Sequence, residues 1–112
     1  MMGQGHIIWG ETEIAMVTYV SLFKWTEQGV TKIADTVKRA EDFAAMAEKA
    51  GGKVKQQYWT VGEYDGVLVF DAPDDVTAIG LLAKLAKAGN VKTHTLRAFE
   101  AGEMKQIVAK AK

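Results

Sequence analysis

Cysteine is absent from the 112-residue chain, and serine and histidine are nearly absent. Without cysteine there are no disulfides, no thiolate nucleophile and no Cys-ligated metal. The one serine, Ser21, has no G-x-S-x-G sequence around it, which argues against serine-based catalysis. The two histidines, His6 and His94, form no H-x-x-x-H motif, and Gly62 and Gly66 form no phosphate-binding loop. We therefore expect no metal and no cofactor.

Net charge is also lacking, because 14 Lys and Arg residues balance 14 Asp and Glu residues. Proteins that bind nucleic acid usually carry a basic surplus, so a nucleic-acid partner is not expected. No apolar run approaches the roughly 18 residues that a membrane helix needs. The N-terminus has neither the basic start nor the sustained apolar stretch of a signal peptide. We expect a cytoplasmic protein with no membrane partner.

The length of the chain allows one small domain. The first strand-like pattern begins just after Met16, so residues 1–15 are interpreted as an N-terminal extension that an early start codon would add. Residues 7–9 are apolar, and the alternative is that this segment forms an extra strand or packs on a partner. Residues 16–112 are the predicted single domain.

Hydrophobic periodicity divides this domain into seven elements. Alternation from Val17 to Trp25 predicts a strand. Apolar positions spaced by three and four residues then predict a helix that ends at the Gly51-Gly52 pair, with a core stripe of Val30, Ile33, Val37, Ala40, Ala44 and Ala47. The remaining predictions are strands over 54–61 and 66–70, a helix over 76–88, a strand over 91–99, and a helix over 103–110 with Met104, Ile107 and Val108 inward.

The predicted order β-α-β-β-α-β-α is that of an α+β, ferredoxin-like sandwich with an extra C-terminal helix. The short connection between the strands at 54–61 and 66–70 makes them an antiparallel hairpin. A four-stranded antiparallel sheet then carries its helices on one face only. The uncovered face holds aromatic and β-branched residues, and such a face is not expected to stay in water. We therefore predict self-association, as a homodimer in which two sheets stack face to face, as in a dimeric α/β barrel, or as a higher homo-oligomer.

Seven short stretches of the domain stand out as motifs in a fixed order. They are Met16–Val20, Trp25–Gly29, Gly51–Val54, Tyr58–Asp65, Ala72–Asp75, Gly89–Val91 and Thr95–Phe99. Together they resemble the GYD domain family, with Gly62, Tyr64 and Asp65 as the name-giving residues. The resemblance covers roughly residues 16–108. It implies the fold of the dimeric α+β barrels, and it implies no activity, because the family has none that carries over to this chain.

The turn with Gly62, Tyr64 and Asp65 has two interpretations. In the structural one, Gly62 and Asp65 shape the turn and Tyr64 covers the hydrophobic edge. In the functional one, the Tyr64 hydroxyl and the Asp65 carboxylate form a hydrogen-bonding pair at the mouth of a ligand pocket. The structural interpretation is favoured, because these are ordinary turn residues.

Strand alternation places Thr93, Thr95 and Arg97 on one face of the last strand and His94 and Leu96 on the other. Because Leu96 is apolar, we expect it to face the helices, which directs Arg97 toward the interior of the dimer. A cation there needs an acceptor. The favoured acceptor is a carboxylate or carbonyl across the dimer, and the alternative is an anionic or carbonyl ligand. We expect His94 to be an exposed or hydrogen-bonded residue at the sheet edge or under a helix, since a lone histidine is seldom catalytic.

Three functions remain open. The first is a small-molecule binding or interaction module that works as a dimer, with a pocket between sheet and helices lined by Tyr19, Trp59, Tyr64 and Arg97, and with Asp65 beside Tyr64. The second is a cofactor-independent enzyme, an oxygenase or isomerase, which is an analogy from the fold alone. The third is a structural or assembly role. For Tyr19 and Trp59, packing of one sheet on the other is the favoured interpretation.

Overall fold

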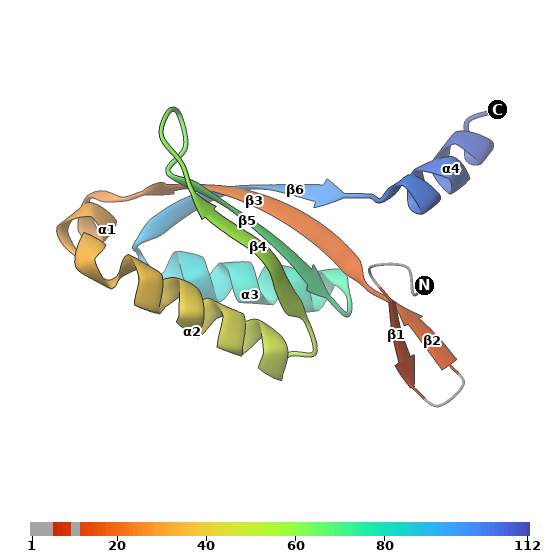
Figure 1. The fold of residues 1–112 in the computed structure, drawn as a ribbon, viewed down its shortest axis with the longest axis horizontal. Helices are drawn as coiled ribbons and strands as arrows, with labels where there is room; N and C mark the ends of the chain where they lie inside the picture. Colours follow the sequence, from red (N-terminus) through yellow and green to blue (C-terminus); the bar gives the residue numbers. More distant parts are fainter. Residues whose placement is uncertain (1–5, 10–11) are drawn as a thin grey trace.

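The computed structural model describes residues 6–9 and 12–112, with side chains from Ala15 onward. Its first element is an antiparallel hairpin of β1 (His6–Trp9) and β2 (Thr12–Ala15), which lies beyond the end of the main sheet (Figure 1). The apolar residues at 7–9 therefore form a strand, as the alternative interpretation held. The interpretation of residues 1–15 as an extension stays a prediction, and its residues 1–5 and 10–11 lie outside the described part of the chain.

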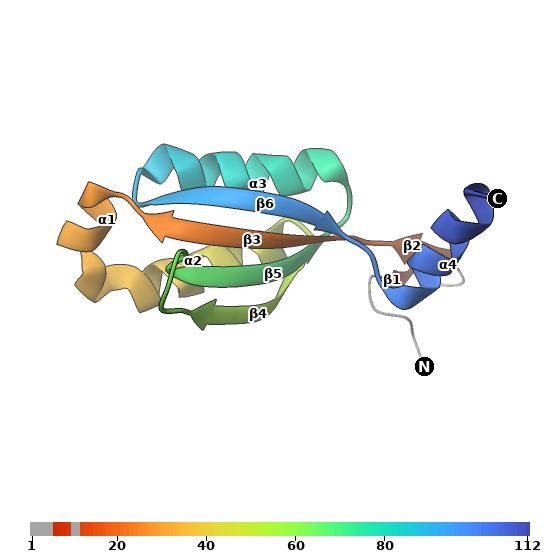
Figure 2. The same ribbon diagram turned by 90° about the horizontal axis from the view of Figure 1, so that it is seen from above.

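The body of the protein is a four-stranded antiparallel sheet with the strand order β4-β5-β3-β6. Its strands are β3 (Val17–Trp25), β4 (Lys53–Trp59), β5 (Gly66–Ala72) and β6 (Val91–Ala98). Two long helices, α2 (Thr36–Lys49) and α3 (Asp75–Ala88), lie on one face, and no described element lies over the other (Figures 1 and 2). The predicted ferredoxin-like fold is confirmed.

The core lies between the sheet and the two helices. Phe70 is fully buried, stacks on the Tyr19 ring with a centroid distance of 5.8 Å, and meets the edge of Phe43 at 5.6 Å. The odd-numbered residues of β3 therefore face the helices. The other buried members of the core are Ala47, Leu68, Ala72, Ala78, Leu81 and Leu82.

The predicted helix after β3 is interrupted. The chain forms α1 (Glu27–Thr31), a 3₁₀ turn η1 (Ile33–Asp35) and then α2. The expected core stripe is wrong in its first half, because the break at Lys32 changes the direction of the chain before α2 reaches the sheet. Only residues farther along α2, such as Phe43, are buried. The three exposed members of the stripe are Val30 (54%), Ile33 (45%) and Val37 (54%).

Helix α3 ends where the sequence predicts and begins one residue earlier, at Asp75. The Asp74 carboxylate accepts a hydrogen bond from the Thr77 N–H at 2.7 Å, and this bond lowers the pKa of Asp74. Gly89 ends the helix with a φ of 82°, which a residue with a side chain rarely adopts. The edge strand β4 shifts its register between Val54 and Gln56, which is the mark of a β-bulge.

The last helix, α4 (Ala101–Lys110), stands apart from the body of the protein (Figure 1). It starts with reciprocal hydrogen bonds between Glu100 and Glu103. None of its residues is buried, so the expected inward packing is wrong within a single chain. Its apolar residues are Met104 (47% exposed), Ile107 (39%) and Val108 (46%). Among the described residues, no helix is both long and apolar enough to cross a bilayer.

Candidate functional site

The five candidate residues from the sequence lie in three separate places. Tyr19 and Arg97 pair directly across β3 and β6. Trp59 ends β4 beside the first turn of α2, where its indole N–H donates to the Thr36 hydroxyl at 3.1 Å. Tyr64 and Asp65 lie in the connection between β4 and β5. Among the described residues, the structure does not bring these five together in one pocket.

The predicted orientation of Arg97 is wrong. Its partner Tyr19 faces the helices, and the Ser21 and Thr95 hydroxyls meet at 2.9 Å on the same side of the sheet. Leu96 therefore points to the uncovered face and is 49% exposed. Thr95 and Arg97 can face the core side because each finds a polar partner there, which the hydrophobicity of Leu96 does not reveal.

Arg97 finds its acceptors within its own chain. Its Nε lies 3.8 Å from Asp75 Oδ1, which also accepts a hydrogen bond from the Tyr19 hydroxyl at 2.6 Å. The guanidinium donates to the Ala98 carbonyl and lies 4.5 Å from the centre of the Phe99 ring. The hydrogen bond to Asp75 is the main cause of a raised pKa for Tyr19, because phenolate formation would remove the donor. This cluster ties the end of β6 to the start of α3.

The turn with Tyr64 and Asp65 is bonded to the end of β3. The Asp65 carboxylate accepts from the Trp25 N–H at 2.9 Å, and the Asp65 N–H donates to the Phe23 carbonyl at 2.8 Å. The Tyr64 hydroxyl lies 3.5 Å from His94 Nδ1. His94 is exposed and lies on the edge strand, facing away from the helices. The backbone and carboxylate contacts of Asp65 hold the turn to the end of β3. The Tyr64–His94 pair lies on the side of the sheet opposite the helices.

A cavity of about 350 Å³ lies between α2, α3 and the helix-facing side of the sheet. Its walls are mostly apolar, with Phe23, Phe43, Met46, Leu68 and Leu85 among them. The sequence therefore anticipated the place of a pocket, between sheet and helices. Of the four residues expected to line it, only Trp59 does so.

Arg39 is the functional candidate that the sequence interpretation missed. It lines the cavity, and its Nη1 donates to the Lys32 carbonyl at 2.8 Å. Its Nη2 is buried and has no hydrogen-bond partner among the described residues. A signal was present in the spacing, because Arg39 precedes Phe43 by four residues and Met46 by seven and so lies on the same helical stripe.

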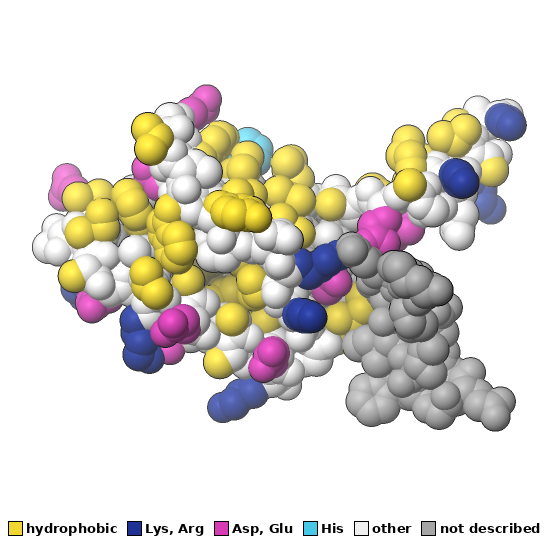
Figure 3. Space-filling view, in the orientation of Figure 1, with side chains coloured by type: hydrophobic (Ala, Val, Ile, Leu, Met, Phe, Trp, Pro, Cys, Tyr) yellow, Lys and Arg dark blue, Asp and Glu magenta, His cyan; other side chains and the backbone are white. Residues whose placement is uncertain are grey.

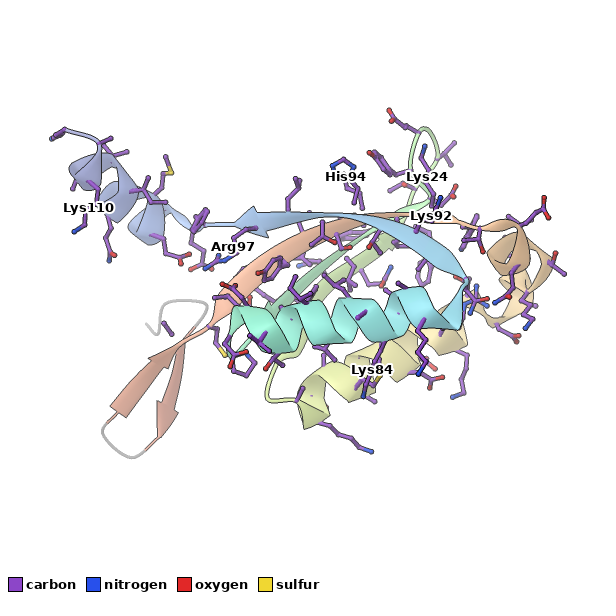
Figure 4. The ribbon with its side chains drawn as sticks, turned by 180° about the vertical axis from the view of Figure 1, so that it is seen from behind. Lys24, Lys84, Lys92, His94, Arg97 and Lys110 are labelled. Atoms are coloured by element: carbon purple, nitrogen blue, oxygen red, sulfur yellow. The ribbon has the colours of Figure 1, made fainter. Side chains whose placement is uncertain are left out.

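The uncovered side of the sheet, here called the open face, has an apolar centre and two polar ends. Its centre is partly exposed and consists of Val20, Leu22, Tyr58, Val67, Val69 and Leu96. At one end, Asp71 accepts a hydrogen bond from Thr18 at 2.5 Å and lies 3.8 Å from Lys55 Nζ. At the other end, Lys24 and Lys92 pair directly across two strands (Figure 4).

Hydrophobic side chains are visible on the open face and again on α4 in the space-filling view (Figure 3). The apolar side chains of α4 and the neighbouring Phe99, which is 49% exposed, add to the apolar surface of the chain. An apolar surface of this extent is typical of a protein that binds another protein.

Comparison with known proteins places this architecture in a family. The family model of the GYD domain matches residues 19–108. A relative from Thermus thermophilus, named "Glutamine synthetase and cystathionine beta-lyase binding protein", is 31% identical over 90 residues, which are 80% of this chain and 95% of that protein. No solved structure gives a significant match. Since the family model spans most of the chain and the relative matches it over nearly its full length, the chain belongs to the GYD domain family.

Proposed function

We propose that this protein is an interaction module that works as a homodimer and binds other proteins. The observation that carries the proposal is the open face, where apolar side chains of all four strands lie with no described element over them. Burial of such a surface is the main favourable contribution to protein association. A second copy of the chain offers a surface of the same chemistry, with apolar centre meeting apolar centre.

The polar ends of the open face support a defined orientation of the two copies. One end carries the cations Lys24 and Lys92, which face each other across neighbouring strands. The other carries Asp71 and Glu100, which share the ammonium group of Lys55 at 3.8 Å and 3.5 Å. Two sheets that stack with opposite ends together place the cations of each copy near the carboxylates of the other, and such complementarity favours one orientation.

Helix α4 belongs to the same proposed interface. Its start is tied to the open face through Glu100 and Lys55, and its apolar residues stay partly exposed, with none of them buried by the described part of the chain. An isolated helix of 10 residues is marginal in water. Contact with the second copy would stabilise α4 by burying its apolar side, so the helix orders fully in the dimer.

A separate surface is left for a different protein. Val30, Ile33 and Val37 are exposed at the start of the helical layer, and Trp59, 40% exposed, is joined to this region by its bond to Thr36. Aromatic and aliphatic side chains of this kind are the usual anchors of protein interfaces. The name of the Thermus relative states that it binds two enzymes, and we propose a protein partner for this chain on that basis.

The mass of the purified chain in solution tests the dimer. Light scattering coupled to size exclusion is expected to give twice the 12.2 kDa of one chain, with dissociation only on strong dilution. A mass of one chain at all concentrations would contradict the proposed use of the open face. Native mass spectrometry of the same sample gives an independent count of the copies.

Partner binding is tested with purified glutamine synthetase and purified cystathionine β-lyase from the source of this chain. Biolayer interferometry on the immobilised dimer is expected to detect binding of at least one enzyme. The variant Ile33→Asp should weaken it, whereas Ile79→Asp, at an exposed position of α3 (52%), serves as the matched control. If neither enzyme binds, or if both variants bind the enzymes equally well, the proposed partner surface is wrong. The dimer is tested separately, by the mass in solution.

A further inference from the structure

The cavity on the helix-facing side of the sheet has the size of a small ligand site. Its volume of about 350 Å³ lies at the lower end of the roughly 300–1,000 Å³ that small-molecule pockets span. Phe23, Phe43 and Leu68 are buried side chains that form part of its wall. An occupant therefore needs a compact apolar body that replaces contacts with these rings and methyl groups.

The charge at this cavity is positive and incompletely paired. Arg39 takes part in none of the ion pairs found among the described residues, and its Nη2 is a buried donor without an acceptor there. The acidic lining residue Asp42 pairs with Lys38 at 2.7 Å and forms no ion pair with Arg39 among the described residues. Lys84, on α3, adds a second cation to the lining (Figure 4).

Buried polar groups without a partner are uncommon in folded proteins, and a guanidinium with one buried, unpaired nitrogen calls for an anionic acceptor. A carboxylate meets that need, because it accepts charge-assisted hydrogen bonds from arginine. The other walls of the cavity are mostly apolar, and Met46 is a flexible side chain that adapts to occupants of different shape. One anionic head and one apolar body are the two features that the lining selects.

The geometry points to a binding site for small amphipathic monocarboxylates, such as medium-chain fatty acids, with Arg39 as the residue that anchors the carboxylate. The apolar chain lies against Phe43, Leu68 and Leu85, and Lys84 attracts the anion from solvent. This site lies on the side of the sheet opposite the open face, so it does not depend on the proposed dimer. It shares Trp59 with the proposed partner surface.

Isothermal titration calorimetry with octanoate and with 1-octanol tests the site on the full chain. Octanoate is expected to bind at one site per chain and about 10-fold to 100-fold more tightly than 1-octanol, since the alcohol lacks the charge that Arg39 recognises. In Arg39→Met, the affinity for octanoate should fall to that for 1-octanol, while 1-octanol binding is retained. Lys49→Met removes an exposed cation from the same helix and should leave both affinities unchanged.

Leu85→Trp fills the cavity and should abolish binding of both compounds, with circular dichroism confirming that the variant is folded. Absence of octanoate binding to the unaltered chain would overturn the site. Equal affinities for octanoate and 1-octanol, or an equal loss of octanoate binding in Arg39→Met and Lys49→Met, would overturn the role of Arg39. The mass in solution, measured on the same samples, tests the proposed dimer independently of ligand binding.

Discussion

Replacement of Leu96 by glutamate separates the stability of the single chain from that of the proposed dimer. Leu96 lies on β6 in the open face and is 49% exposed. A glutamate at this place can extend its carboxylate into water in a single chain, so the fold should be retained. In a stacked pair of sheets the same carboxylate would be buried against an apolar surface without an opposite charge to pair with.

The size of the effect follows from the exposure of Leu96. Full burial of a leucine side chain contributes about 1.5–3 kcal/mol, so the exposed half leaves roughly 0.7–1.5 kcal/mol to be gained by each copy. In a two-fold symmetric dimer this burial energy is lost in both copies. Burial of an unpaired carboxylate costs several kcal/mol more in each copy. Since 1.4 kcal/mol is a factor of ten, the dimer Kd should rise by at least about 1,000-fold.

Sedimentation velocity over a wide concentration range measures this change. The unaltered chain should sediment as a dimer and Leu96→Glu as a monomer at the same concentration. Ile79→Glu is the matched control, because Ile79 is exposed to a similar degree (52%) but lies on α3, on the other side of the sheet. Thermal unfolding by circular dichroism, at a concentration where both variants are monomeric, establishes that the two chains are equally folded.

The reasoning would be refuted if Leu96→Glu remained a dimer with an unchanged Kd. It would also be refuted if Ile79→Glu dissociated the dimer as fully as Leu96→Glu, because the helical side of the chain would then carry the interface.

Three further predictions concern stability. Gly66→Ala should destabilise the fold by about 1–3 kcal/mol or more in urea unfolding, since an added Cβ would lie 2.1 Å from the Phe23 ring; an unchanged midpoint contradicts this. The raised pKa of Tyr19 means that stability is complete below the ordinary tyrosine value of about 10 and falls as pH rises above it, and Asp75→Asn should reduce that alkaline loss in melting curves. The lowered pKa of Asp74 works in the opposite direction, so its contribution is present above the ordinary aspartate range and falls as pH drops through it, and Asp74→Ala should flatten the acid side of the same pH series.

The architecture could be predicted because local patterns and global packing agree. Alternation in β3 predicts a strand, and the glycine after α3 predicts the end of a helix. The order of the elements is then compatible with few topologies. The prediction failed at Val30, Ile33 and Val37 because local pattern and global packing disagree there. Their spacing is helical, but whether a helical stripe meets the sheet depends on where the chain turns, and the break at Lys32 is a tertiary feature.

The candidate site was less predictable than the fold. Arg97 was assigned to the wrong face because the strand offers two faces and the hydrophobicity of Leu96 suggested the core. The true arrangement depends on partners far along the chain, above all Asp75, which pairs with both Tyr19 and Arg97. Arg39 was missed because a charged residue on a helix is usually solvated, and only the packed structure shows its buried nitrogen.

The bulge in β4 also limits how the chain can associate. Strand order leaves β4 and β6 as the two edges of the sheet, where backbone groups are free to pair with another strand. The register shift between Val54 and Gln56 twists one edge, and Lys53 and Lys92 place a charge on each. Pairing through edges would add strands without limit and lead to fibres, whereas pairing through faces stops at two copies. The edges of the sheet therefore favour a closed pair over an open polymer.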